Sequence, residues 1–142
     1  MQLNGTRFGH IEVDNARVIT LGSGLIGFPE ETRFVLLQAG DGQSISWLQS
    51  LRTPALAFPV IDGRAVAPGY DSTNQIELAR LANIDSHGVS VLVIVAARAG
   101  GAALIANLLA PIVIDSSTRM GAQVVLDSAK YSPSTPICAV AA

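Results

Sequence analysis

The chain has 142 residues, of which 49% are hydrophobic, 14% charged and 5% aromatic, and its formal net charge is −2. This composition excludes a disordered chain, and the length fits one domain with one core. The slight acidity provides no basic field for a phosphate backbone, so we expect no direct binding of nucleic acid. The single cysteine, Cys138, can form neither an internal disulfide nor a thiolate metal site, which fits a reducing compartment.

The most apolar stretch covers residues 89–114 and is interrupted by Arg98, Asn107 and Pro111. Neither of its apolar runs approaches the roughly 20 residues that span a bilayer. The first residues lack a basic segment followed by a long apolar one, so we expect no signal peptide. The sequence therefore predicts a cytoplasmic protein without membrane association.

Strand patterns dominate the first sixty residues. Phe8–Val13 alternates apolar and polar residues, and a second strand pattern at residues 17–21 follows the turn signal Asp14-Asn15, which together predict a hairpin. A glycine-rich loop is expected at residues 22–29. Further strands are expected at residues 34–37, 45–51 and 56–61. Pro59 places the last of these at a sheet edge or a bulge.

The second half contains the one clear helix pattern, at residues 73–83, where Ser72 or Thr73 can cap the first turn. Buried strands are expected at residues 89–97, 112–115 and 123–127, with a turn at 116–121 and a second buried segment at 102–110. We therefore predict a mainly β single domain over residues 1–137, followed by a short tail at 138–142. Its architecture is expected to be a compact antiparallel β-barrel or sandwich with one short helix inserted.

The loop from Gly22 to Gly27 matches the G-x-G-x-x-G pattern of dinucleotide-binding proteins, and Asp41 follows 19 residues after Gly22. That function requires a helix to begin inside the loop. Pro29, two residues after Gly27, would break such a helix. We therefore expect Gly24 and Gly27 to be structural, at positions with φ above zero that glycine fills at little cost.

Catalytic and metal-binding patterns are absent from the sequence. His10 and His87 have no zinc-ligand spacing, no G-x-S-x-G elbow is present, and the adjacent pair Glu30-Glu31 is typical of a solvated loop. We expect no enzyme activity, no cofactor and no metal. Asn107 is unusual because an amide in so apolar a run must find hydrogen-bond partners or reach the surface. It is interpreted either as a structural amide or as a contact residue.

An ordered series of motifs resembles the family of the flagellar assembly factor FliW, over nearly the whole chain. The series consists of residues 24–28 (GLIGF), 34–37 (FVLL), 48–54 (LQSLRTP), 57–58 (AF), 107–114 (NLLAPIVI) and 123–126 (QVVL), with Tyr131 and Pro136 at the end. Each motif alone is weak, and the ordered set is specific. The chain departs from the family pattern at Ile26, where proline is common, and at Leu109, where a polar or basic residue is frequent.

The resemblance implies a non-enzymatic protein that binds flagellin. When flagellin is exported, the freed factor is expected to bind CsrA, the translational repressor of flagellin mRNA, and so to couple export to synthesis. It further implies a monomer when free, with Gly24, Gly27, Phe28, Pro54 and Pro111 as structural motif residues.

A basic repressor is best contacted by exposed acidic residues beside an aromatic anchor, a combination that Tyr70 and Asp71 offer. In the alternative interpretation Asp71 helps to start the helix and Tyr70 packs beneath it. With Glu30, Glu31 and Asn107, these two residues make up the candidate partner-binding set. Two other functions stay open: a nucleotide-binding oxidoreductase that uses Gly22–Gly27, and a self-associating structural β domain.

Overall fold

The computed structural model describes residues 1–38, 45–66, 70–84, 88–97 and 104–137, and the backbone alone for residues 71–76. In this part of the chain there are eleven strands, two α-helices and one short 3-10 helix. The strands are β1 (Gln2–Thr6), β2 (Gly9–Glu12), β3 (Ile19–Leu21), β4 (Arg33–Gln38), β5 (Ser46–Ser50), β6 (Ala57–Asp62), β7 (Val89–Ala97), β8 (Leu104–Ala106), β9 (Ile112–Asp115), β10 (Met120–Gln123) and β11 (Thr135–Ile137). The helices are η1 (Asn15–Arg17), α1 (Gly63–Val66) and α2 (Tyr70–Leu81). The mainly β prediction is confirmed, with more strands and one more α-helix than expected.

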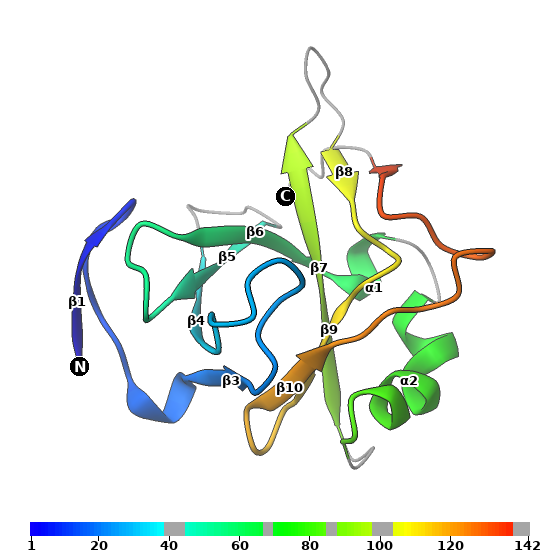
Figure 1. The fold of residues 1–142 in the computed structure, drawn as a ribbon, viewed down its shortest axis with the longest axis horizontal. Helices are drawn as coiled ribbons and strands as arrows, with labels where there is room; N and C mark the ends of the chain where they lie inside the picture. Colours follow the sequence, from blue (N-terminus) through cyan, green and yellow to red (C-terminus); the bar gives the residue numbers. More distant parts are fainter. Residues whose placement is uncertain (39–44, 67–69, 85–87, 98–103, 138–142) are drawn as a thin grey trace.

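Seven strands close into a barrel (Figure 1). The order is β7-β6-β5-β4-β3-β10-β9, and β9 pairs again with β7 to complete the ring. All neighbours in the ring are antiparallel except β3 and β10, which run parallel. The prediction of a compact, mainly antiparallel barrel is therefore confirmed, and β8 and β11 extend the sheet from β7.

Three clusters of apolar side chains form the core. The barrel interior holds Ile19, Leu21, Leu25, Phe34, Leu48, Val60, Leu92, Ile112 and Ile114. Outside the barrel, α2 and β8 cover the other face of β6, β7 and β9 through a cluster that includes Tyr70, Leu78, Val93 and Val113. Because β7 is covered on both faces, its sequence is a nearly continuous apolar run. A smaller cluster, Leu3, Val13 and Val35, joins the β1–β2 pair to β4.

The prediction that residues 8–13 form a hairpin with residues 17–21 is wrong. β2 pairs with β1, a strand that the sequence analysis did not identify, and not with residues 17–21. The signal Asp14-Asn15 starts η1, because the Asp14 carboxylate accepts a hydrogen bond from the Ala16 N–H at 2.9 Å. Residues 19–21 pair with β4 instead.

The helix boundaries also differ from the prediction. α2 begins at Tyr70, so the expected cap at Ser72 or Thr73 is wrong, and Asn83 lies beyond the helix with φ +58°. The short helix α1 was not predicted, because Asp62-Gly63 was interpreted as a turn. The Asp62 carboxylate accepts a hydrogen bond from the Arg64 N–H at 2.9 Å and so caps α1.

The last barrel strand lies earlier than predicted, at Met120–Gln123 rather than residues 123–127. Pro59 pairs with Trp47 of β5, in the part of β6 that precedes its pairing with β7, so it occupies a local edge. No helix among the described residues is both long and apolar enough to cross a membrane.

Candidate partner-binding surface

Three large apolar side chains are exposed on and beside residues 22–29, which we call the glycine loop. Ile26 is 63% exposed, Phe28 41% and Met120, at the start of β10, 56%. We call these three residues the apolar ledge. Ile26 and Phe28 lie on the loop, and Met120 borders a hollow together with Gly22 and Ser23 at the start of the loop. Exposed large apolar side chains are typical of protein-binding surfaces. The loop is thus the first candidate for a functional site.

The tip of the glycine loop is a tight turn. Leu25 and Phe28 exchange both backbone hydrogen bonds, at 3.1 and 2.7 Å, with Ile26 and Gly27 between them. Gly27 has φ +86°, which is the third position of a type II turn. The prediction that Gly27 has a positive φ is confirmed, and the turn presents Ile26 to solvent. Phe28 packs edge-on against Phe58, with ring centroids 5.1 Å apart.

Gly24 fixes the base of the same loop. It has φ +69°, and a Cβ built there would lie 2.5 Å from the Phe28 carbonyl oxygen and 2.6 Å from that of Pro29. Only glycine fits, both because of the backbone conformation and because of this close approach. The expected positive φ of Gly24 is confirmed, and the next regular element after the loop is β4, not a helix.

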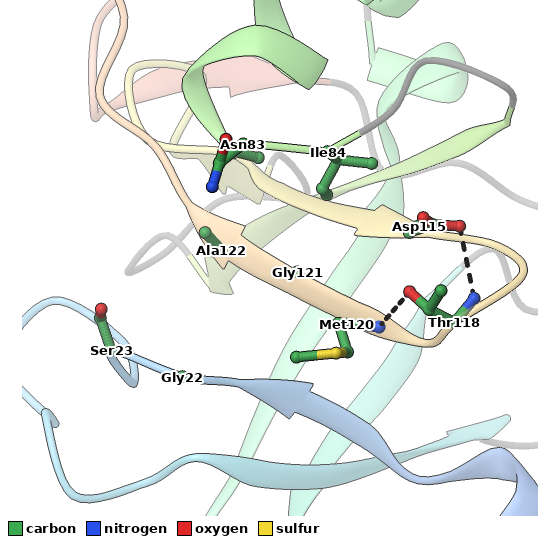
Figure 2. A pocket seen from close by; sticks show the side chains of 10 residues that line it. Gly22, Ser23, Asn83, Ile84, Asp115, Thr118, Met120, Gly121 and Ala122 are labelled. Atoms are coloured by element: carbon green, nitrogen blue, oxygen red, sulfur yellow. Dashed lines mark hydrogen bonds between the residues drawn. The ribbon is translucent and has the colours of Figure 1, made fainter.

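Gln123 of β10 holds the loop against the barrel. Its side-chain oxygen accepts a hydrogen bond from the Ile26 N–H at 2.7 Å, and its amide nitrogen donates to the Ala110 carbonyl at 3.0 Å. Beside it lies a hollow of about 380 Å³ (Figure 2). The hollow is lined by Gly22, Ser23, Asn83, Ile84, Asp115, Thr118, Met120, Gly121 and Ala122, among others.

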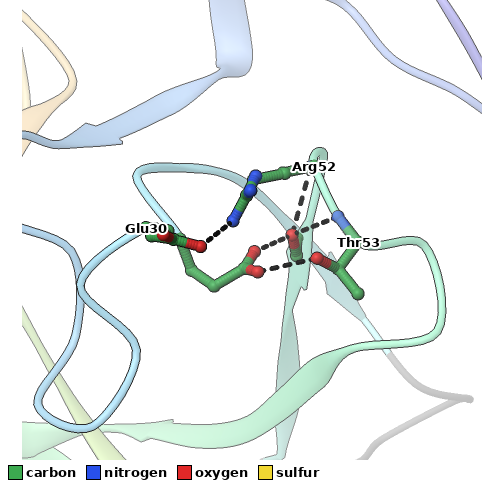
Figure 3. A network of polar contacts seen from close by, with 5 residues as sticks. Glu30, Arg52 and Thr53 are labelled. Atoms are coloured by element: carbon green, nitrogen blue, oxygen red, sulfur yellow. Dashed lines mark hydrogen bonds and ion pairs between the residues drawn. The ribbon is translucent and has the colours of Figure 1, made fainter.

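A polar network supports the other end of the loop (Figure 3). The Glu31 carboxylate accepts hydrogen bonds from the Ser50 hydroxyl and, at 2.7 Å, from the Thr53 hydroxyl. The neighbouring Glu30 is exposed and pairs with Arg52 at 2.8 Å. Glu31 is buried, so the interpretation of both residues as a solvated loop is wrong for Glu31.

The Glu31 carboxyl is held in its charged form. Burial alone would raise its pKa, but hydrogen bonds from Ser50 and Thr53 and the charge of Arg52 lower the pKa below its ordinary value of 4.5. The charged carboxylate therefore links the glycine loop to the turn after β5.

Tyr70 and Asp71, the predicted anchor pair, do not form an exposed pair in the described structure. Tyr70 is 3% exposed, its hydroxyl donates to the Leu108 carbonyl at 2.6 Å, and its ring packs edge-on against Tyr131. Burial, with a smaller contribution from Tyr131, raises the pKa of the Tyr70 phenol. The ring therefore packs beneath the helix, as the alternative interpretation has it. The Asp71 side chain lies outside the described residues.

The remaining candidate residues are Asn107, Pro54 and Pro111, which take part in hydrogen bonds or lie in the core. The Asn107 side-chain oxygen accepts a hydrogen bond from the Ala110 N–H at 3.2 Å, and its backbone N–H donates to Ile94. The Pro54 carbonyl accepts from the Gln49 side chain at 2.9 Å. Pro111 is fully buried. These contacts fit the structural interpretation of all three residues, and none of them reaches the apolar ledge.

Sequence reasoning missed Ser50 and Gln123 as supports of the glycine loop, and Gln49 as a support of the turn after β5. Gln49 is fully buried, and its amide nitrogen donates to the carbonyls of Ser50, Pro54 and Leu56. The available signal was the polar pair Gln49-Ser50 between two leucines. Polar side chains in a buried strand must find hydrogen-bond partners.

No metal-binding cluster of three His, Cys, Asp or Glu side chains occurs in the described part of the chain. His10 lies exposed on β2 and contacts Asn4 and Glu12, whereas His87 and Cys138 lie outside the described residues. The surface offers apolar and hydrogen-bonding groups, which suit the binding of another protein.

Comparison with known proteins gives a consistent result. The family model "FliW protein" matches residues 2–137. Relatives with the name flagellar assembly factor FliW include those of Syntrophus aciditrophicus, 36% identical over 92% of this chain and 84% of the relative, and Heliobacterium modesticaldum, 35% identical over 93% and 87%. A crystal structure of the flagellar assembly factor FliW superposes with a TM-score of 0.80 at 30% identity, covering 97% of both chains.

Proposed function

The chain belongs to the FliW family of flagellar assembly factors, and on this premise we propose that it binds flagellin and, when free, binds and antagonises the translational repressor CsrA. The proposed function is protein binding in the cytoplasm, without a catalytic step, a cofactor or direct contact with nucleic acid. Export of flagellin would release the factor, and the free factor would bind CsrA and so restore translation of the flagellin mRNA.

The observation that carries the flagellin proposal is the apolar ledge on a fixed loop. Ile26, Phe28 and Met120 expose apolar surface, while Gly24, Gln123 and the Glu31 network hold the backbone beneath them. A surface fixed before binding loses little conformational entropy when a partner docks. We therefore place flagellin on the apolar ledge.

The chain offers a matched pair of variants for this test. Phe28 and Phe8 are 41% and 37% exposed, and each packs edge-on against one aromatic ring, that of Phe58 or of Trp47. Phe8 lies in the β1–β2 turn, away from the glycine loop. Calorimetry with the cognate flagellin should show about a tenfold or larger loss of affinity for Phe28→Ala and little change for Phe8→Ala.

An equal loss of flagellin affinity in both variants would show that flagellin does not bind at the apolar ledge. No heat and no co-elution with the unaltered protein would overturn flagellin binding itself.

For the repressor we retain Asp71 at the start of α2 as a contact residue. Asp71→Lys should weaken binding to CsrA sharply, and more at low salt, because the charges of the two proteins are complementary. Glu12→Lys on β2 makes the same charge change at an exposed site of the N-terminal hairpin and serves as the control. Normal CsrA binding by Asp71→Lys at several salt concentrations would place the contact elsewhere.

A further inference from the structure

Two arginines meet at one end of the barrel. Arg17 ends η1 just before β3, and Arg119 precedes β10. The parallel register of β3 and β10 aligns Met120 with Thr20, so both arginines lie at the same end. The Arg119 guanidinium donates from Nη2 to the Arg17 carbonyl at 3.0 Å. This bond holds the Arg119 side chain against the Arg17 backbone.

The arginines border a hollow of about 590 Å³ whose other described lining residues are Leu36, Leu37 and Gln38 at the end of β4. Leu36 packs against the barrel interior and Leu37 against the cluster beneath the β1–β2 pair. The described lining of the hollow therefore combines apolar side chains with an amide and two positive charges. Such a combination suits a ligand with an aliphatic part and an anionic group.

Neither arginine forms an ion pair within the described residues, whereas Arg52, Arg64 and Arg80 each do. The Arg119 Nε is buried and has no hydrogen-bond acceptor among them. Arg119 also has φ +64°, a conformation that costs a non-glycine residue free energy. The Nε–H of Arg119 is thus a buried donor without an acceptor among the described residues, and an acceptor supplied by a ligand would satisfy it.

We propose that this hollow, formed by Arg17, Leu36, Leu37, Gln38 and Arg119, binds an acidic segment of a protein partner, with a carboxylate side chain between the two guanidinium groups and an adjacent aliphatic side chain on the leucines. Guanidinium groups bind carboxylates through paired, charge-assisted hydrogen bonds. The apolar lining disfavours a bare phosphate, and the net charge of −2 disfavours a polyanion. The proposal depends only on these five residues and not on flagellin or CsrA binding.

The test uses NMR of the full chain labelled with ¹⁵N, following the arginine Nε–Hε signals. The probes are two blocked peptides, acetyl-Leu-Glu-Leu-amide and acetyl-Leu-Gln-Leu-amide, which differ by one charge, and inorganic phosphate. The glutamate peptide should shift the Arg119 and Arg17 signals in a saturable way at millimolar concentration, and the glutamine peptide should not. Equal shifts with both peptides, no saturable shift, or a tighter response to phosphate would overturn the proposal.

Variants complete the design. Arg119→Gly removes the guanidinium at a position where glycine accepts the backbone conformation, so the fold should be retained. Affinity for the glutamate peptide should fall about tenfold or more. Arg33→Gln removes an exposed arginine at the opposite end of β4 and should leave affinity unchanged. A folded Arg119→Gly variant that binds as tightly as the parent would exclude Arg119 from the site and overturn the proposal.

Discussion

Ile26 occupies the second position of the type II turn whose third position is Gly27. That second position favours proline, because the proline ring presets the required φ. In this chain the Ile26 N–H donates to Gln123, a hydrogen bond that proline could not make. The turn is therefore fixed by a hydrogen bond to Gln123 of β10 and not by a proline ring.

Three glycines of this loop give a graded prediction. Gly22 has open space for a Cβ and no positive φ, Gly27 has open space but φ +86°, and Gly24 has both φ +69° and a close carbonyl. Substitution by alanine should lower the free energy of unfolding little at Gly22, by about 1–2 kcal/mol at Gly27, and by more at Gly24. Urea denaturation measures the series. Equal losses at Gly24 and Gly22 would contradict the geometry.

Glu31 predicts a dependence of stability on pH. Because its pKa is lowered in the folded chain, its charge stabilises the fold above pH 4.5, and this stabilisation is lost as the pH falls through the folded pKa. The difference in unfolding free energy between the parent and Glu31→Gln should be largest near neutral pH and shrink in acid. Denaturation at a series of pH values measures it.

Glu30→Gln is the matched control, because Glu30 is exposed and its ion pair with Arg52 is solvated, so it should contribute little to stability. If the Glu31→Gln difference were constant from neutral pH into acid, the Glu31 charge would contribute nothing to the fold.

At the scale of elements, sequence patterns show where strands lie better than they show which strands pair with each other. The run at residues 89–97 and the glycine loop were predictable, because a doubly covered strand and a positive φ leave local signals. The pairing of β2 with β1 was not, since alternation does not say which neighbour a strand takes. The Glu31 network joins residues 19 and 22 positions apart, a distance that leaves no local pattern.

Helix α2 is attached at its first residue. The Tyr70 hydroxyl donates to the Leu108 carbonyl within the bend that Asn107 closes. Tyr70→Phe leaves that buried carbonyl without the tyrosine donor and should lower the unfolding free energy by about 1–2 kcal/mol. Thermal and urea denaturation measure the loss. An unchanged slope of the unfolding free energy against urea concentration (the m value) would indicate an intact fold. A variant as stable as the parent would show that the hydroxyl does not hold α2.

For the whole molecule, closure of the barrel depends on Gly121. It pairs with Leu21 on one side and Ile114 on the other, and a Cβ there would lie 2.2 Å from the Val113 carbonyl oxygen. The clashing atom belongs to the backbone and cannot turn aside as a side chain could. Gly121→Ala should therefore destabilise the fold by several kcal/mol, well beyond a typical substitution. Circular dichroism during denaturation measures the loss. A stable Gly121→Ala barrel would contradict the tight crossing, and Gly22→Ala is the control.

The parallel pair of β3 and β10 joins residues 20 and 120. On a ribosome, β3 must wait for about 100 residues of further synthesis, on the order of 5–20 s, before its neighbour emerges. Contacts of such long separation also make folding slow. The glycine loop waits equally, because Gln123 holds Ile26. A nascent chain thus completes the glycine loop only after residue 123 has left the ribosome.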